Sequence, residues 1–353
     1  MEIDGTMKNQ SVAEKTRKSI LISTLVVLVL FCAGTAFVLY PVFSLRPDKS
    51  GMFYVERRMT LEAFADSVTA KFGREFSDKV MLLHGWRAID LSHRVGAYKV
   101  NLGDSPWDFW KKLRTGLQSP VKITFNNLRT VDDFASAMAD QLSFEKTDLL
   151  PFLTDSAQCV AKGFTTATLP AMLLSDTYEV YWSVSPENLM NKLYKNYQAF
   201  WTDSRLGKAK RLGFTPQEVA TLASIVDSET ADNSEKSAIA RLYINRIRKG
   251  MKLQSDPTVK FAVGNPALRR ILNRHLAVES PYNTYLVAGL PPGPICLPQK
   301  STIDAVLNAP EHDYIYMCAK PDFSGTHDFA ANYQDHLRNA ERYRRELNKR
   351  GIK

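Results

Sequence analysis

The sequence contains few cysteines, and those it has show no regular spacing. Only 4 of its 353 residues are cysteine. Cys32 lies in a long apolar run, and Cys159, Cys296 and Cys318 are an odd, widely spaced set. Such a set gives neither a disulfide framework nor the paired spacing of a zinc site. We therefore expect buried thiols, with a single disulfide pair as the alternative, and we expect no metal and no cofactor.

Lysine and arginine are abundant, but they form no recognisable nucleic-acid module. The formal net charge is +9, with 24% charged and 44% hydrophobic residues, which is ordinary for a folded protein. A basic balance suits nucleic acid, an acidic polymer or a membrane surface alike. Because no cluster of basic and aromatic residues occurs, we expect no nucleic-acid partner.

One long apolar run lies near the N-terminus. Residues 20–40 form 21 uncharged positions, enough to cross a bilayer as a helix. A cleaved signal peptide is the alternative, weakly supported by small residues at Ala33 and Ala36. Four basic residues precede the run, namely Lys8, Lys15, Arg17 and Lys18. By the positive-inside rule, they place the N-terminal side of the helix in the cytoplasm.

These features predict a single-pass protein of the inner (cytoplasmic) membrane with its N-terminus in the cytoplasm. We expect a cytoplasmic tail over 1–18, a transmembrane helix over 19–41 and a linker over 42–50. The remainder of the chain is then extracytoplasmic, or periplasmic where an outer membrane exists.

Residues 51–120 have the pattern of a small α+β domain. Strands are expected over 52–57 and 96–100, with one helix from Thr60 and another over 77–85 between them. Strand–helix–helix–strand is the plan of the LysM carbohydrate-binding module, although many small α+β folds share it. We therefore predict a LysM-like domain.

Residues 121–353 are expected to form a mixed α/β domain, which makes the whole chain α+β. Thr130 opens a second strand-then-helix unit about 70 residues after Thr60. Regular structure is expected as strands over 121–125, 259–263 and 314–318 and as helices over 185–201 and 332–349. Proline and glycine predict irregular backbone over 282–285 and 290–295.

The stretch 215–257 reads as two helices joined by a short polar turn. Thr215 and Glu218 form a capping box at the start of the first helix. Glu229 falls at the edge of the apolar face of that helix, and Asp227 points to the other side. The apolar face consists of Val219, Leu222, Ala223 and Val226.

A carboxyl group placed against apolar surface loses hydration, and its pKa rises. An acid that stays protonated near neutral pH is what protonation of a glycosidic oxygen requires. From the spacing alone, Glu229 is either such an acid or a surface glutamate at a fraying helix end.

The stretch 225–259 resembles the core of the YceG-like endolytic murein transglycosylases, the MltG family. Further matches follow at 282–285 and 289–295, and His327 stands in a Gly-x-His-x-Phe pattern. The sequence departs from the family pattern at Asp227, where the family has Glu, and at Pro170-Ala171, where it has Glu-Gly. The core matches are Asn245, Arg246, Gly250, Met251, Leu253, Gln254, Asp256, Pro257 and Thr258.

The resemblance implies that Glu229 is the catalytic acid of a peptidoglycan lytic transglycosylase, a carbon–oxygen lyase. Hydrolysing glycosidases usually need two carboxylates, whereas a lytic transglycosylase needs one. Loops with aromatic and amide side chains suit sugar rings and their hydroxyls. The expected substrate-binding residues are Asn245, Arg246, Gln254, Asp256, Tyr282, Asn283 and His327, with an ion pair and a turn as the alternatives for Arg246 and Asp256.

The resemblance further implies cleavage between MurNAc and GlcNAc within nascent glycan strands, which leaves 1,6-anhydro-MurNAc ends and terminates elongation. Penicillin-binding synthases are the implied partners. The alternative is a peptidoglycan-binding scaffold with an impaired catalytic centre, which the departures at Asp227 and Pro170-Ala171 favour. Retention of Glu229 and of the block 245–258 disfavours it.

Overall fold

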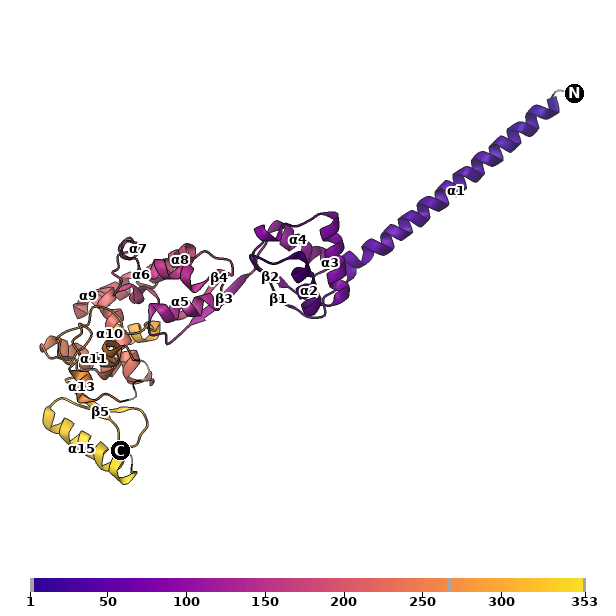
Figure 1. Cartoon of the computed structure of the whole chain (residues 1–353). Coiled ribbons are helices and arrows are strands. Elements are labelled where there is room, and N and C mark those ends of the chain that lie inside the picture. Colours follow the sequence, from indigo (N-terminus) through magenta and orange to yellow (C-terminus); the bar gives the residue numbers. More distant parts are fainter. Residues whose placement is uncertain (1–2, 266–267, 269, 352–353) are drawn as a thin grey trace. The chain divides into compact units, whose positions relative to one another are not determined.

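The computed structural model describes residues 3–265, 268 and 270–351 (Figure 1). The first two residues of the predicted tail and the last two of the predicted catalytic domain lie outside the described residues. The chain divides into two compact units, residues 1–121 and 122–353.

A single long helix, α1 (Ile3–Ser44), begins the first unit. Its part Thr16–Ser44 is 29 residues long, and it is the one helix among the described residues that is long and apolar enough to cross a membrane. The expected apolar helix is therefore present. Length and composition support this assignment, and a signal sequence meets the same criteria.

The rest of the first unit follows the predicted strand–helix–helix–strand order. Strands β1 (Gly51–Val55) and β2 (Gly96–Val100) pair antiparallel, with Phe53 opposite Tyr98. Helices α2 (Leu61–Phe72) and α3 (Arg74–Trp86) lie between these strands in sequence. Helix α3 is longer at both ends than the predicted helix over 77–85. The short 3-10 helix η1 (Leu91–His93) precedes β2, and α4 (Pro106–Thr115) follows it.

Aromatic rings fill the core of this unit around Phe109 of α4. The Phe109 ring centroid lies 5.4 Å from that of Phe53 and 5.8 Å from that of Phe72. Both pairs are T-shaped, a favourable arrangement for aromatic rings. Since Phe53 lies on β1 and Phe72 ends α2, these contacts hold the strand pair, α2 and α4 together.

The second unit is mainly helical, with its strands in two-stranded pairs, β3 with β4 and β5 with β6. Described residues of the whole chain therefore form a mixed α+β structure, as predicted. The strands are β3 (Pro120–Phe125), which crosses the unit boundary, β4 (Asp176–Tyr181), β5 (Tyr316–Ala319) and β6 (His327–Ala330). The helices are α5 (Val131–Ala139), α6 (Lys146–Thr154), α7 (Ser156–Val160), η2 (Leu169–Met172), α8 (Pro186–Phe200), α9 (Asp203–Leu212), α10 (Pro216–Glu229), α11 (Lys236–Arg248), α12 (Asp256–Val263), α13 (Asn273–Leu276), α14 (Lys300–Leu307) and α15 (Tyr333–Lys349).

The predicted strand over 259–263 is wrong, because these residues form the second half of helix α12. Pro257 occupies the first turn of this helix, where its missing N–H costs no hydrogen bond. A short apolar run cannot be assigned to strand or helix by periodicity alone. The helix matters for the site because its first turn follows Ser255.

Helix α10 is more deeply buried than an amphipathic stripe predicts. Every residue from Val219 to Val226 is buried, including Thr221 and Ser224. The helix packs against α9, α11, α12, α14 and η2. It is thus the central helix of the second unit, and Glu229 is its last residue.

An irregular segment, residues 289–299, crosses beside α10. The amide of Ile295 donates to the Ser224 hydroxyl over 3.0 Å, and the amide of Leu297 donates to the carbonyl of Leu128 over 2.8 Å. A Cβ atom at Gly293 would overlap the carbonyl oxygen of Ala167, so this close approach requires glycine. The segment therefore connects α10 with the turn between β3 and α5.

We expect Thr215→Ala to lower the free energy of unfolding by about 1 kcal/mol. The Thr215 hydroxyl accepts from the Glu218 amide over 3.2 Å, and the Thr215 amide donates to the Glu218 carboxylate over 2.7 Å. The alanine variant leaves the first turn of α10 without the first of these bonds. Urea unfolding measures the loss, and Thr215→Ser, which keeps the hydroxyl, is the matched control. Equal stability of both variants would contradict this role.

Candidate active site

Glu229 lies where α10 ends against α11 and the start of α12. Its Oε1 accepts hydrogen bonds from the hydroxyl of Tyr243 over 2.6 Å and from the hydroxyl of Ser255 over 2.5 Å. Tyr243 and Ser255 are both buried. Its Oε2 makes no hydrogen bond to any described residue. One oxygen is therefore held in place, and the other is left for a bound molecule.

Burial raises the pKa of Glu229 above the usual range of a glutamate. The hydroxyls of Ser255 and Tyr243 stabilise the carboxylate and oppose this rise, in that order. The negative charge of Asp256 adds to the rise, and His327 opposes it. The net direction is upward, so the protonated form of Glu229 persists to higher pH than for an exposed glutamate.

A cavity of about 240 Å³ opens beside Glu229. Of the eight residues predicted from the sequence, the structure brings five to this cavity, namely Glu229, Arg246, Gln254, Asp256 and His327. Tyr243, Tyr285 and Tyr316 line it as well. The cavity thus combines one acid of raised pKa with aromatic and hydrogen-bonding groups.

Arg246 and Gln254 form one wall of the cavity. Arg246 Nη2 donates to Gln254 Oε1 over 2.6 Å, while its Nε donates to the carbonyl of Lys252 over 2.9 Å. Burial lowers the pKa of Arg246. Gln254 has φ of 51°, a left-handed conformation that is costly for a residue with a side chain. The guanidinium group therefore holds a strained backbone in place at the cavity.

His327 and Asp256 reach the cavity with fixed orientations. The Nδ1 atom of His327 lies 3.1 Å from Oε2 of Glu235, whose Oε1 accepts from the His327 amide over 2.6 Å. Asp256 Oδ1 accepts from the Tyr285 hydroxyl over 2.8 Å. Burial is the main cause that raises the pKa of Tyr285, so this hydroxyl stays protonated as a donor.

The other three predicted residues, Asn245, Tyr282 and Asn283, do not line this cavity. Asn245 donates to the carbonyls of His312 and Tyr314. Asn283 is fully buried and donates to two backbone carbonyls, and the Tyr282 ring packs 4.7 Å from that of Phe261. Their contacts favour a role in fixing loops around the site over contact with substrate.

Asp227 points away from Glu229, as its position on the helix predicts. Its Oδ1 lies 2.9 Å from Lys236 Nζ and accepts from the Thr302 hydroxyl over 2.5 Å, and its Oδ2 accepts from the Gln299 amide over 3.0 Å. These contacts join α10 to α11 and α14. Both oxygens of Asp227 are therefore engaged in contacts between helices, and Asp227 does not line the Glu229 cavity.

Sequence reasoning missed Tyr243 and Ser255, the two donors to Glu229. Tyr243 lies one turn before Ile247 on α11, and Ser255 lies between Gln254 and Asp256 in the block already identified. A serine and a tyrosine carry no distinctive signal in a single sequence, because both are common in packed helices and turns. Their role follows from the fold, which brings Tyr243 of α11 and Ser255 of the turn before α12 within hydrogen-bond distance of Glu229 at the end of α10.

The fold and site define a protein with one half-buried acid in a polar and aromatic cavity, a group suited to general acid–base chemistry. The sequence profile of the YceG-like family matches residues 53–342. The chain therefore belongs to the YceG-like family, which confirms the resemblance found in the sequence.

Several known proteins are similar to this chain. An endolytic murein transglycosylase of Bacillus subtilis is 28% identical over 266 residues, covering 71% of this chain and 73% of the relative. One of Streptococcus pneumoniae is 31% identical over 189 residues, but the match spans only 33% of its length. The crystal structure of a yceG-like protein from Listeria monocytogenes has a TM-score of 0.57 at 23% identity, covering 82% of this chain and 98% of that one, which shows a shared fold.

Proposed function

We propose that this protein is a peptidoglycan lytic transglycosylase that cuts the bond between MurNAc and GlcNAc and leaves 1,6-anhydro-MurNAc ends. The observation that carries the proposal is the partly buried Glu229, with its raised pKa and one unengaged oxygen beside a cavity. The names of the B. subtilis and S. pneumoniae relatives support it.

Glu229 would act twice in the reaction. The protonated acid gives its proton to the glycosidic oxygen, so the GlcNAc part leaves as an alcohol. The resulting carboxylate then takes the proton of the muramyl 6-hydroxyl, whose oxygen bonds to C1 and closes the anhydro ring. No water is consumed and the acid is regenerated. This use of one carboxyl group fits a cavity in which Asp256 is held by Tyr285.

The other cavity residues would bind the sugar. Arg246, Gln254 and Asp256 offer donors and acceptors for hydroxyl and acetamide groups. His327, fixed by Glu235, would orient the sugar next to Glu229. Asn245, Tyr282 and Asn283 would support these residues through the loops they fix.

The proposal extends to the rest of the chain. Residues 19–41 would anchor the protein in the inner membrane with the tail 1–18 in the cytoplasm, so that the catalytic domain 121–353 meets nascent strands outside. Residues 51–120 would serve as a LysM-like glycan-binding domain. Cleavage within strands would end their elongation, with penicillin-binding synthases as partners.

Purified full-length protein in detergent tests the activity. Incubated with uncrosslinked glycan strands, it should shorten them, as measured by size-separating chromatography. Strands that stay intact but bind the protein would support the alternative, a peptidoglycan-binding scaffold, and would contradict the proposed activity.

We expect Ser255→Ala to move the alkaline limb of the pH–kcat profile to higher pH. Glu229 must be protonated to act as an acid, so the rate falls as pH rises through its pKa. Ser255 stabilises the carboxylate, and its removal raises the pKa of Glu229 further. Kinetics at a series of pH values measure the limb. A limb that stays in place or moves to lower pH would contradict the bond's role.

A further inference from the structure

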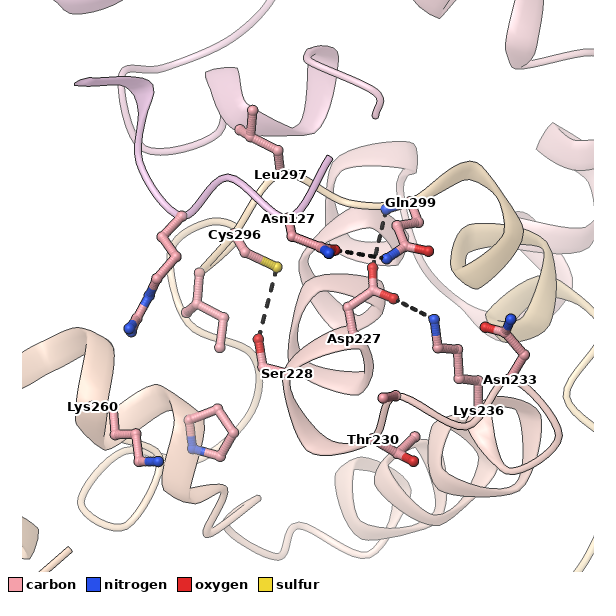
Figure 2. A pocket seen from close by; sticks show the side chains of 14 residues that line it. Asn127, Asp227, Ser228, Thr230, Asn233, Lys236, Lys260, Cys296, Leu297 and Gln299 are labelled. Atoms are coloured by element: carbon pink, nitrogen blue, oxygen red, sulfur yellow. Dashed lines mark hydrogen bonds and ion pairs between the residues drawn. The ribbon is translucent and has the colours of Figure 1, made fainter. Parts of the chain in front are cut away.

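A second and larger cavity, of about 500 Å³, lies on the other side of the end of α10 (Figure 2). Its walls come from the end of α10, the turn 230–233 and the start of α11, and from α12, the turn before α5 and the segment 295–299. Its polar lining residues include Asn127, Arg129, Asp227, Lys236, Lys260 and Gln299. All residues that line the cavity belong to the second unit.

The charges in this cavity do not balance. Asp227 is the sole acidic residue lining it, and Figure 2 shows Asp227 directed toward Lys236, with which it forms an ion pair. Two other cations, Arg129 and Lys260, are half-buried and have no ion-pair partner among the described residues. The cavity therefore carries two uncompensated positive charges, an arrangement that attracts an anionic group.

The shape of the cavity is maintained by hydrogen bonds. Gln299 Nε2 donates to Asn127 Oδ1 over 3.1 Å, and Figure 2 shows the two side chains directed toward each other. Asn127 has φ of 55°, in the left-handed region. The Leu297 amide bond to Leu128 fixes the same turn against the crossing segment. The backbone just before Arg129 is thus set by contacts within the fold.

The cavity adjoins the Glu229 site. Ser228 and Thr230 line the cavity with the two cations, whereas Glu229 between them lines the other one. Pro257 and Asp256 alternate in the same way at the start of α12. The two cavities therefore border on the same two segments, the end of α10 and the start of α12.

We propose that this second cavity binds an anionic oxygen group of the substrate, namely a carboxylate of the stem peptide carried by the glycan strand. The proposal rests on the proposed function. Each muramyl residue of a strand bears a lactyl-linked peptide with free carboxylates, so a strand cut internally presents one next to the bond. A phosphate group, as in the pyrophosphate at a lipid-linked strand end, is the other source of this chemistry.

The test compares two substrates with one double variant. Uncrosslinked strands with their stem peptides and strands stripped of peptides are each digested by full-length protein in detergent. The wild type should show a KM about tenfold or more lower for the peptide-bearing strands, since charge-assisted hydrogen bonds are the strong ones. In the double variant Arg129→Gln/Lys260→Gln the ratio of the two KM values should fall toward one.

A matched control removes the same charges elsewhere. Arg211→Gln/Lys195→Gln changes one exposed arginine and one exposed lysine of the same unit, outside both cavities, and should keep the wild-type KM ratio. Equal KM values for both substrates with the wild-type protein, or an unchanged ratio in the cavity variant, would overturn the proposal.

A binding measurement separates this proposal from the proposed function. Calorimetric titration of the full-length protein with a free stem tetrapeptide should show binding that the cavity variant loses, whether or not strands are cut. Inorganic pyrophosphate is the second probe. Binding of pyrophosphate without binding of the peptide would overturn the assignment to the stem. Peptide binding by a protein that cuts no strand would leave the carboxylate site in place and contradict the lytic activity.

Discussion

The Glu229→Gln variant is expected to cut glycan strands about 10³-fold more slowly than the wild type, within the range that a positioned acid–base group supplies. Glutamine keeps the shape and can still accept from Tyr243 and Ser255, but it has no proton to give to the glycosidic oxygen. The loss should fall on kcat, with KM little changed, because the contacts of the ground state remain. Initial rates on uncrosslinked strands measure both.

Glu187→Gln is the control for this prediction. Glu187 is an exposed acid on α8, far in sequence from the cavity residues, and its change should leave the rate at the wild-type value. A Glu229→Gln rate within tenfold of the wild type would contradict the role of Glu229 as the acid.

Asp227→Ala is expected to lower the free energy of unfolding by about 3–5 kcal/mol, the usual cost of removing one partner of a buried ion pair. The side chains of Lys236 and Asp227 are only 4% and 6% exposed. The variant leaves the Lys236 ammonium buried with Thr302 as its remaining hydrogen-bond partner. Urea unfolding of the full-length protein in detergent measures the loss.

Two further variants test whether the lost stability comes from the unpaired buried charge of Lys236. In Asp227→Leu/Lys236→Met no buried charge remains, so much of the lost stability should return. Lys146→Ala breaks the exposed pair with Asp132, whose side chains are 36% and 61% exposed, and should cost at most about 1 kcal/mol. Equal losses of unfolding free energy for the buried and the exposed pair would contradict the explanation by burial of an unpaired charge.

Local signals in the sequence predicted many of the elements. The Thr60, Thr130 and Thr215 caps each begin a helix in the structure, because a hydroxyl that satisfies a free amide is a property of a few adjacent residues. The helix over 332–349 is present as α15, with no buried residues. Strand β2 and the irregular segments at 282–285 and 290–295 were predicted for the same local reasons.

Other features depend on the tertiary fold and could not be predicted. The second half of helix α12 has the apolar composition of a strand, although Pro257 stands in the first turn of the helix. Asn245 and Asn283 looked like sugar ligands, yet their amides donate to backbone carbonyls, which for Asn245 belong to the distant segment 312–314. The cavity with Arg129 and Lys260 joins residues more than a hundred positions apart, a proximity that spacing does not reveal.

Glu229 itself lies between these cases. From its place at the edge of an apolar helix face, Glu229 was either an acid with a raised pKa or a surface glutamate, and in the structure burial raises its pKa. Its donors Tyr243 and Ser255, which determine how far the pKa rises, come from α11 and from the turn before α12. The family resemblance identified Glu229 as the candidate acid, and the packing of α10, α11 and the turn before α12 determines the surroundings of its carboxyl group.

If Glu229 closes an anhydro ring without water, oxygen from the solvent does not enter the new strand ends. Mass spectrometry of the ends formed by the full-length protein in water enriched in ¹⁸O measures this. We expect 1,6-anhydro-MurNAc ends that contain no ¹⁸O, and no such ends with Glu229→Gln. Reducing ends that carry ¹⁸O would show hydrolysis, which requires a second carboxylate or another activator of water, and would rule out the proposed lytic mechanism.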